Sequence, residues 1–187
     1  MERHDAVLTF VELFEPLVVC FTECVHLDKE TATSAEMLLS SLGRSEFIVA
    51  TASMNQVLSV TKPLSVNLQT VGIDMMKAMQ LVGNIIECLE EKRSSDESFD
   101  VVWTQSSTMA NIIGTDLKQP RQVARQRYRV NIDCDSDQEY FKRSVYIPFL
   151  DHVISELRER FSVHQQRIVN LCVLIPKCIT SYSFTNF

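Results

Sequence analysis

The sequence predicts an all-α fold, a helical bundle, on three observations. Glycine is scarce, with 4 in 187 residues against about 7% in an average protein, and tight hairpins depend on the positive φ of glycine. Apolar residues recur three and four positions apart along most of the chain, which is the period of an amphipathic helix. Capping residues separate these segments. Hydrophobic residues make up 45% of the chain, so a sizeable core is expected.

The first helical segments are predicted at residues 5–26 and after Thr33. Pro16 lies inside the first of them, and we expect a kink or break there because proline cannot donate a helical hydrogen bond. Thr33 and Glu36 have the spacing of a capping box and are expected to begin the second segment. Gly43 follows its last apolar residue and is expected to end it.

Three longer helices follow, at residues 45–70, 73–93 and 97–113. Pro63 interrupts the first of these, and Gly114 ends the third. The middle helix has a wide apolar face, which is typical of a helix packed in a bundle. One stripe of this face consists of Met75, Met79, Val82, Ile86 and Leu89. The row beside it consists of Ala78, Leu81, Ile85 and Cys88.

Residues 115–135 lack a helical pattern. Between 128 and 134, apolar and polar residues alternate as in a strand. No convincing partner strand is nearby, so we predict an extended loop. Ser136 and Glu139 form a second capping box, which begins the last helix.

The last helix contains an Asp–His pair, Asp151 and His152, that could belong to an active site. Adjacent helical residues point about 100° apart, so the two side chains cannot face one substrate atom together. Glu156 and Arg160, one turn apart, favour a solvated face with a salt bridge. The segment is therefore predicted to be a scaffold helix. Its structural positions are Leu150, Val153 and Leu157 in the buried stripe, and Pro148 in a first helical turn.

Two groups of residues have partial metal-site spacing. They are Cys20, Cys24 and His26, and Asp133, Asp135 and Asp137. The first group lacks a second Cys/His pair, so burial of the two cysteines explains it. The second has Gln138 where a calcium loop needs glycine. Since phosphate-binding and nucleophile motifs are also missing, we predict no catalytic residue, metal site, cofactor or small-molecule substrate.

Charge is distributed unevenly along the chain. The net charge is −6, but residues 118–129 carry +5 and no acid, which leaves −11 for the rest. An acidic body is not typical of a general nucleic-acid binder. The basic segment allows one weak, non-specific DNA contact along a phosphate backbone, and the alternative is a solvated loop. The DNA-contact candidates are Lys118, Arg121, Arg125, Arg127 and Arg129.

The six cysteines bear on the cellular compartment. The first residues contain no apolar signal region, and no apolar run approaches the roughly 18 residues that a membrane span needs. We therefore expect reduced, buried thiols in an intracellular protein that does not cross a membrane.

Four stretches resemble the transposases of the hAT superfamily and the host proteins derived from them, among which are THAP-type and zinc finger MYM-type proteins. The stretches are RHDAVLTFVELFEPLV, FIVATASMNQVLSVTKPLSVNLQ, IDMMKAMQLVGNIIECLEEKR and YFKRSVYIPFLDHVISELRERF. The resemblance runs from about Arg3 to about Ile179. In that family a long all-helical insertion splits a ribonuclease-H-like domain, and the catalytic acids flank the insertion. This chain looks like the insertion alone, and no residue in it matches a catalytic acid.

The resemblance implies one all-helical domain at residues 1–179 and an unstructured tail at 180–187. It implies a catalytically inert module that contacts a ribonuclease-H-like domain, a second protomer or DNA. The implied location is nuclear or cytoplasmic, with the nucleus favoured. An exposed apolar patch is expected where a catalytic domain would pack. Two alternatives stay open: part of an active DNA transposase whose catalytic triad lies outside this chain, and a decaying transposon remnant without function.

Overall fold

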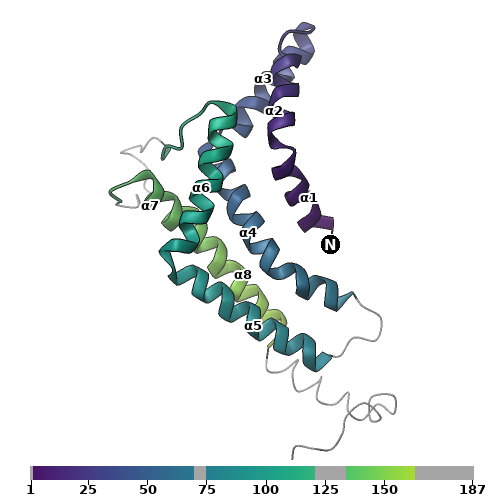
Figure 1. The fold of residues 1–187 in the computed structure, drawn as a ribbon, viewed down its shortest axis with the longest axis vertical. Coiled ribbons are helices and arrows are strands. Elements are labelled where there is room, and N and C mark those ends of the chain that lie inside the picture. The colour runs from purple at the N-terminus through teal and green to yellow at the C-terminus, as the bar shows by residue number, and fades with distance from the viewer. Residues whose placement is uncertain (1, 70–74, 121–133, 163–187) are drawn as a thin grey trace, which may run out of the picture.

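The computed structural model describes residues 2–69, 75–120 and 134–162, and within these ranges every regular element is a helix (Figure 1). The predicted all-α helical bundle is confirmed. The elements are α1 (Glu2–Glu12), α2 (Phe14–Cys24), α3 (Lys29–Leu42), α4 (Ser45–Leu68), α5 (Met75–Ser94), α6 (Asp96–Ile113), α7 (Asp137–Phe141), the π-helical turn η1 (Lys142–Tyr146) and α8 (Ile147–Arg160). The predicted tail, and residues 121–133 of the predicted loop, lie outside the described residues.

None of the described helices is both long enough and apolar enough to span a membrane.

Helices α4, α5, α6 and α8 form the body of the molecule, with α7 and η1 beside them (Figure 1). Each contributes apolar residues at helical spacing to one continuous interior, termed here the main core. Its buried members are Val49, Ala52, Val57, Leu64, Val82, Ile85, Leu89, Phe99, Val102, Phe141, Tyr146, Leu150 and Ile154. The apolar period seen in the sequence is therefore what closes the bundle.

A second, smaller cluster, termed here the upper core, joins the N-terminal helices to the bundle. Its buried members are Phe14 and Val18 of α2, Ile48 of α4, and Met109 and Ala110 of α6. The Phe10 ring of α1 meets the rings of Phe14 and Phe47 edge-on, with both pairs of ring centroids 5.9 Å apart. The same two helices, α4 and α6, thus contribute to both cores.

Buried hydroxyl groups on α4 and α6 are satisfied within their own helices. Ser53 Oγ donates to Val49 O at 2.7 Å, and Ser106 Oγ donates to Val102 O at 2.8 Å. Because each hydroxyl has a partner, burial of these small side chains leaves no unpaired polar atom at either position.

One partly buried polar network connects three elements beside the main core. Tyr146 OH of η1 donates to Gln56 Oε1 of α4 at 2.7 Å, and Gln56 Nε2 donates to Ser98 O of α6 at 3.0 Å. Burial raises the pKa of Tyr146 to about 12, so the phenol stays protonated and acts as a donor at neutral pH.

The break predicted near Pro16 is present, and it lies at Leu13 between α1 and α2. Pro16 has no N–H to donate to Glu12 O, and its ring would crowd that carbonyl in a continuous helix. The chain therefore ends α1 at Glu12 and starts again at Phe14. Pro16 then falls in the first turn of α2, where a missing N–H costs little.

The predicted start of α3 at Thr33 is wrong. The helix begins at Lys29, and Asp28 is its N-cap, because the carboxylate of Asp28 accepts the N–H groups of Glu30 and Thr31 at 3.2 Å each. Thr33 lies inside the helix and donates its hydroxyl to Lys29 O. A carboxylate at the positive end of a helix is a strong cap. Asp28, which precedes Thr33 in the chain, therefore sets the start of α3.

The predicted interruption at Pro63 is also wrong, since α4 continues from Ser45 to Leu68. Proline removes the hydrogen bond to Ser59 O. The next residue, Leu64, is buried in the main core with 5% of its surface exposed. Packing of the helix beyond the proline therefore offsets the lost hydrogen bond.

The caps predicted at Gly114 and Ser136 are confirmed, although the last helix, predicted to begin at Ser136, is divided into α7, η1 and α8. Gly114 ends α6 with φ 72°, and Thr115 N–H donates to Ala110 O at 3.0 Å, which completes a Schellman-type C-cap. Ser136 begins α7, with its Oγ accepting the N–H of Glu139 at 3.2 Å.

Truncation at Leu150 should lower the free energy of unfolding by about 2–5 kcal/mol, because a fully buried leucine would leave a cavity in the main core. Val101→Ala is the control, since that side chain on α6 is 63% exposed. It should change stability by less than about 0.5 kcal/mol. Chemical denaturation followed by circular dichroism measures both, and equal effects would contradict the assignment of the core.

Candidate interaction surface

The predicted DNA-contact residues fall largely outside the described part of the chain. The four arginines lie within residues 121–133, and Lys118 alone is described. Its Nζ donates to Asp116 Oδ2 at 2.8 Å, in an ion pair whose two side chains are 71% and 78% exposed. This hydrogen bond raises the pKa of Lys118. Lys118 is thus a solvated cation at the entry to the basic segment.

The start of the basic segment adjoins fixed backbone. Ser45 Oγ, at the start of α4, accepts Lys118 N–H at 3.1 Å and donates to Asp116 O at 3.4 Å. Gln119 N–H donates to Asp137 Oδ1, at the start of α7, at 2.9 Å. These bonds fix residues 115–120 against two helices, so the basic segment begins from an ordered stem.

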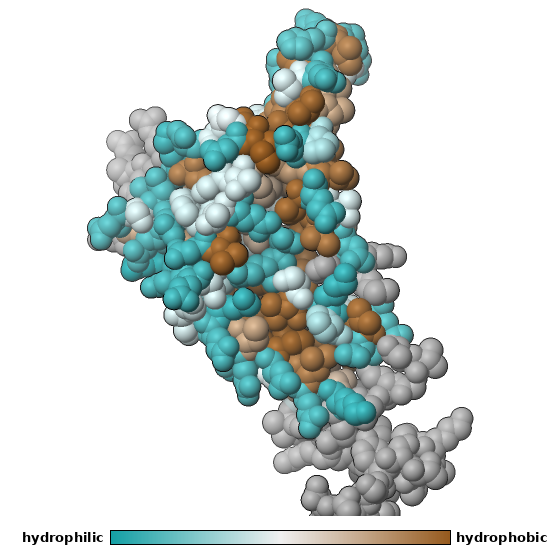
Figure 2. Space-filling model, in the orientation of Figure 1, coloured by the Kyte–Doolittle hydropathy of each residue, from teal (hydrophilic) through white to brown (hydrophobic). Residues whose placement is uncertain are grey.

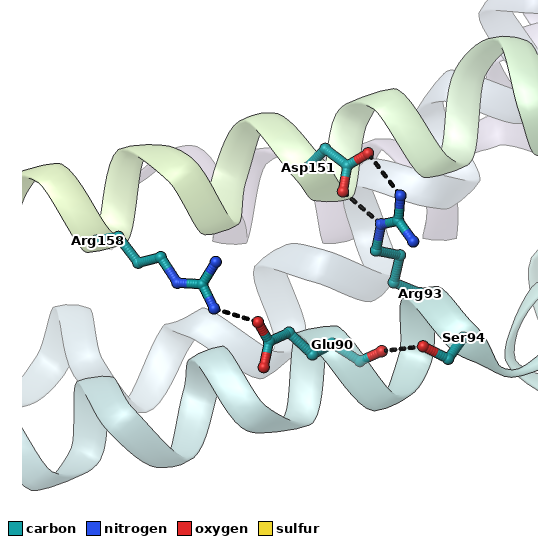
Figure 3. Close-up of polar contacts among 5 residues, drawn as sticks. All are labelled: Glu90, Arg93, Ser94, Asp151 and Arg158. Carbon is teal, nitrogen blue, oxygen red and sulfur yellow. Dashed lines mark hydrogen bonds and ion pairs between the residues drawn. The ribbon is translucent and has the colours of Figure 1, made fainter.

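Asp151 belongs to an ion pair between α5 and α8 (Figure 3). Arg93 donates from Nε to Asp151 Oδ1 and from Nη2 to Asp151 Oδ2, the second bond at 3.0 Å. Farther along the same helices, Arg158 donates to Glu90 (Figure 3). Both oxygens of Asp151 are therefore used in a helix–helix contact, and His152 is exposed beside it.

The electrostatics of this contact follow from its geometry. Hydrogen bonding to Arg93 lowers the pKa of Asp151, so the carboxylate is ionised across the neutral and mildly acidic range. Arg160 also donates to Glu156 Oε2 at 3.0 Å, as the spacing predicts. The exposed surface of α8 thus carries the ion pair between Glu156 and Arg160.

The four predicted structural positions of α8 differ in burial. Leu150 is fully buried, whereas Val153 and Leu157 are partly buried and pack against the main core. Ile154, which lies next to Val153 in the sequence, is 5% exposed and is buried more deeply than Val153 or Leu157. Pro148 is exposed in the first turn, directly after η1, where Ile147 N–H donates to Lys142 O five residues earlier.

The residues with partial metal-site spacing have other surroundings. In the described part of the chain, no three His, Cys, Asp or Glu side chains gather as metal ligands would. The interpretation of Cys20 and Cys24 as buried is wrong, since Cys20 is exposed and Cys24 is half-buried. Partial burial, with the adjacent Cys20, raises the pKa of Cys24, so this thiol is a weak nucleophile. Asp137 holds the loop backbone.

Several exposed apolar side chains lie on the α2–α3 hairpin, residues 14–42, which extends beyond the bundle at the top of Figure 1. Apolar side chains lie among hydrophilic ones over this hairpin in Figure 2. Its exposed large hydrophobic residues, with their exposed fractions, are Val19 (52%), Leu27 (64%), Met37 (67%) and Leu38 (48%). On α3 the one fully buried side chain among the described residues is Ala35.

Sequence reasoning missed these residues, although one signal was present. Met37, Leu38 and Leu39 are consecutive apolar residues on a helix, and three consecutive positions cannot all face the same neighbour. In the structure only Leu39 packs against the upper core. The run therefore marked an apolar surface left facing solvent.

The matches to known proteins include two related repressors. The chain is 25% identical to the human "52 kDa repressor of the inhibitor of the protein kinase" over 189 residues, and 25% identical to the mouse protein of the same name over 190 residues. Each match covers 97% of this chain, and the chain spans about a quarter of the length of these relatives. No family model matches the chain. No solved structure matches it either.

These matches show similarity to a repressor over nearly the whole chain. The resemblance to hAT transposases, to THAP-type and to zinc finger MYM-type proteins stays a prediction.

Asp151→Asn should lower the melting temperature at neutral pH, because the neutral amide cannot replace the charged contact with Arg93. The folded-state pKa of Asp151 is lowered, so its stabilisation is present above the unfolded value, near 3.9, and is lost as the pH falls through the folded value. The difference from wild type should therefore shrink as the pH falls below the unfolded value, near 3.9. His152→Ala is the control and should have little effect. A difference between Asp151→Asn and wild type that persists unchanged at pH 2 would contradict the charged contact.

Proposed function

We propose that the chain is a catalytically inert, helical protein-interaction module of a protein derived from a hAT transposase. The observation that carries this proposal is the α2–α3 hairpin, which projects from a well-packed body and exposes Met37 and Leu38. Large apolar side chains exposed together on a projecting hairpin mark a candidate interaction site.

The similarity to the human and mouse repressors supports a regulatory role. We extend that role to this chain as part of the proposal, together with a nuclear location. The proposed partner is a ribonuclease-H-like domain or a second protomer, as the family resemblance implies.

The rival function is a helical part of an active DNA transposase whose catalytic triad lies outside this chain. Asp151, the candidate acid inside the chain, is engaged by Arg93, which favours the inert module. Sequencing the transcript on both sides of the coding region for these 187 residues would distinguish the two, because an active enzyme needs flanking acids in the same reading frame.

The paired substitutions Met37→Ser and Leu38→Ser should abolish concentration-dependent self-association of the isolated chain. They replace exposed apolar surface while leaving both cores intact. Sedimentation velocity measures the association, and circular dichroism verifies that helix content is unchanged. Val101→Ser, equally apolar to polar but outside the hairpin, should associate as wild type does. A wild-type chain that stays monomeric at all concentrations would count against an interaction surface on the hairpin.

A second proposed function is a weak DNA contact through the basic segment, favoured by the ordered stem from which it begins. Each phosphate neutralised contributes about −0.9 to the slope of log affinity against log salt. The five candidates, Lys118, Arg121, Arg125, Arg127 and Arg129, would give a slope of at most about −4.5. The acidic remainder of the chain should keep the affinity low.

Replacing Arg125, Arg127 and Arg129 by alanine should flatten the salt slope by about 2–3 units. Fluorescence anisotropy with duplex DNA measures it. A control with Lys29, Arg44 and Lys77 replaced removes the same charge outside the segment and should keep the slope. An unchanged slope in the arginine variant would show that the contact lies elsewhere, and no binding by wild type at low salt would leave the segment a solvated loop.

A further inference from the structure

An open cleft of about 400 Å³ lies where the α2–α3 hairpin leaves the bundle. Three helices form its walls: α2, α3 and the end of α6. The apolar lining residues are Val18, Leu39, Ile112 and Ile113, and Thr22, Ser40 and Thr115 add hydroxyl groups. A cleft lined by both apolar side chains and hydroxyl groups has room for a single large side chain from a partner.

The apolar surface continues from the cleft onto the hairpin. Val19 lies one helical turn from Thr22, and Met37 lies one turn from Ser40, so each neighbours a residue that lines the cleft. These two side chains are 52% and 67% exposed. A partner seated in the cleft would therefore also cover part of the exposed hairpin.

Acidic side chains flank this surface. Glu15 lies one turn before Val18, and Glu36 lies one turn before Leu39 and Ser40. Over residues 14–42 the chain has five acids and one lysine, a net charge of −4 with histidine neutral. All five acids are exposed. The cleft thus combines apolar and hydroxyl-bearing lining residues with a hairpin of net negative charge, and Arg44, an exposed cation, directly follows its lining residue Gly43.

On the basis of the proposed interaction function, we propose that this cleft binds a basic amphipathic helix of a partner protein. One large apolar side chain of that helix enters the cleft, and its lysines or arginines lie opposite Glu15 and Glu36. Charge complementarity selects this occupant, because nucleic acids, anionic membranes and acidic peptides carry the same sign as the hairpin and are repelled. An apolar anchor on a helix laid into a groove is a common recognition mode.

Gly43 offers a way to block the cleft from inside. It lines the cleft and has φ −78° and ψ 0°, which any L-residue adopts without strain. A Cβ added there would have Ile113 Cδ1 as its nearest side-chain atom, at 3.7 Å, an ordinary contact. The ring of Gly43→Phe should therefore occupy the space proposed for the anchor. Gly83→Phe on α5 is the matched control, since a Cβ at Gly83 meets nothing within 4 Å.

The test uses the whole chain and a fluorescent synthetic peptide of about 18 residues, five helical turns, with leucine and lysine at helical period and one central phenylalanine. Anisotropy should show binding to wild type, weakened at least about tenfold by Gly43→Phe and unchanged by Gly83→Phe. A peptide with glutamate in place of lysine should bind at least about tenfold more weakly. In wild type, hydrogen exchange should slow on peptide addition at residues 39–43 and 110–115.

Equal binding by wild type and Gly43→Phe, or slowed exchange confined to other residues, would overturn the cleft as the site. The exchange measurement needs no variant, so it decides the matter even if Gly43→Phe does not fold. If binding survives Gly43→Phe but is lost in the Met37→Ser and Leu38→Ser chain, the cleft fails while the interaction function stands. If neither Gly43→Phe nor the Met37→Ser and Leu38→Ser chain alters binding, the cleft and the proposed interaction function both fail.

Discussion

Helix α4 is buried on two sides where Ile48 and Val49 adjoin, and the rest of the structure depends on this double burial. Each of these residues has no exposed surface, yet Ile48 packs in the upper core and Val49 in the main core. Since adjacent side chains on a helix point about 100° apart, one turn of α4 can serve both cores. Helix α6 contributes to both cores in the same way, through Met109 and Val102. Packing against α4 and α6 therefore stabilises the N-terminal helices.

This arrangement explains how a stable body can carry an exposed hairpin. The upper core holds the base of the hairpin through Phe14 and Val18, and α3 has little buried surface of its own. Its apolar residues Met37 and Leu38 stay in water, at a cost in free energy that the main core offsets. Surface with that composition is stabilised when a partner covers it, which is the physical basis of the proposed interaction function.

The sequence predicted most of the helices because their apolar residues follow the helical period and their caps are local. The C-cap at Gly114 and the N-cap at Ser136 depend on bonds within a few residues, so the sequence contains the necessary information. Two competing caps close together, Asp28 and Thr33, could not be ranked by spacing alone. The continuation of α4 through Pro63 depends on tertiary packing, which no local sequence pattern indicates.

The candidate site was harder to predict than the fold. Periodicity shows which side of a helix is apolar, but it does not show whether another helix covers that side. The exposure of Met37 and Leu38 was therefore not predicted, and Cys20 was taken as buried. The partner of Asp151 could not be predicted either, because Arg93 is 58 residues away in the sequence. Long-range contacts of this kind depend on how the helices pack.

Hydrogen exchange of the unliganded chain, resolved by residue, tests most directly the claim that the hairpin is held at its base by the upper core. Amides in the α4 segment 49–57 and the α6 segment 102–110 should exchange only through global unfolding. Amides in the α3 segment 32–38 should exchange through local opening, at a distinctly lower free energy. If α3 were protected as strongly as α4 and α6, the hairpin would unfold cooperatively with the bundle. The claim that the hairpin is an exposed interaction element, held only at its base, would then be wrong.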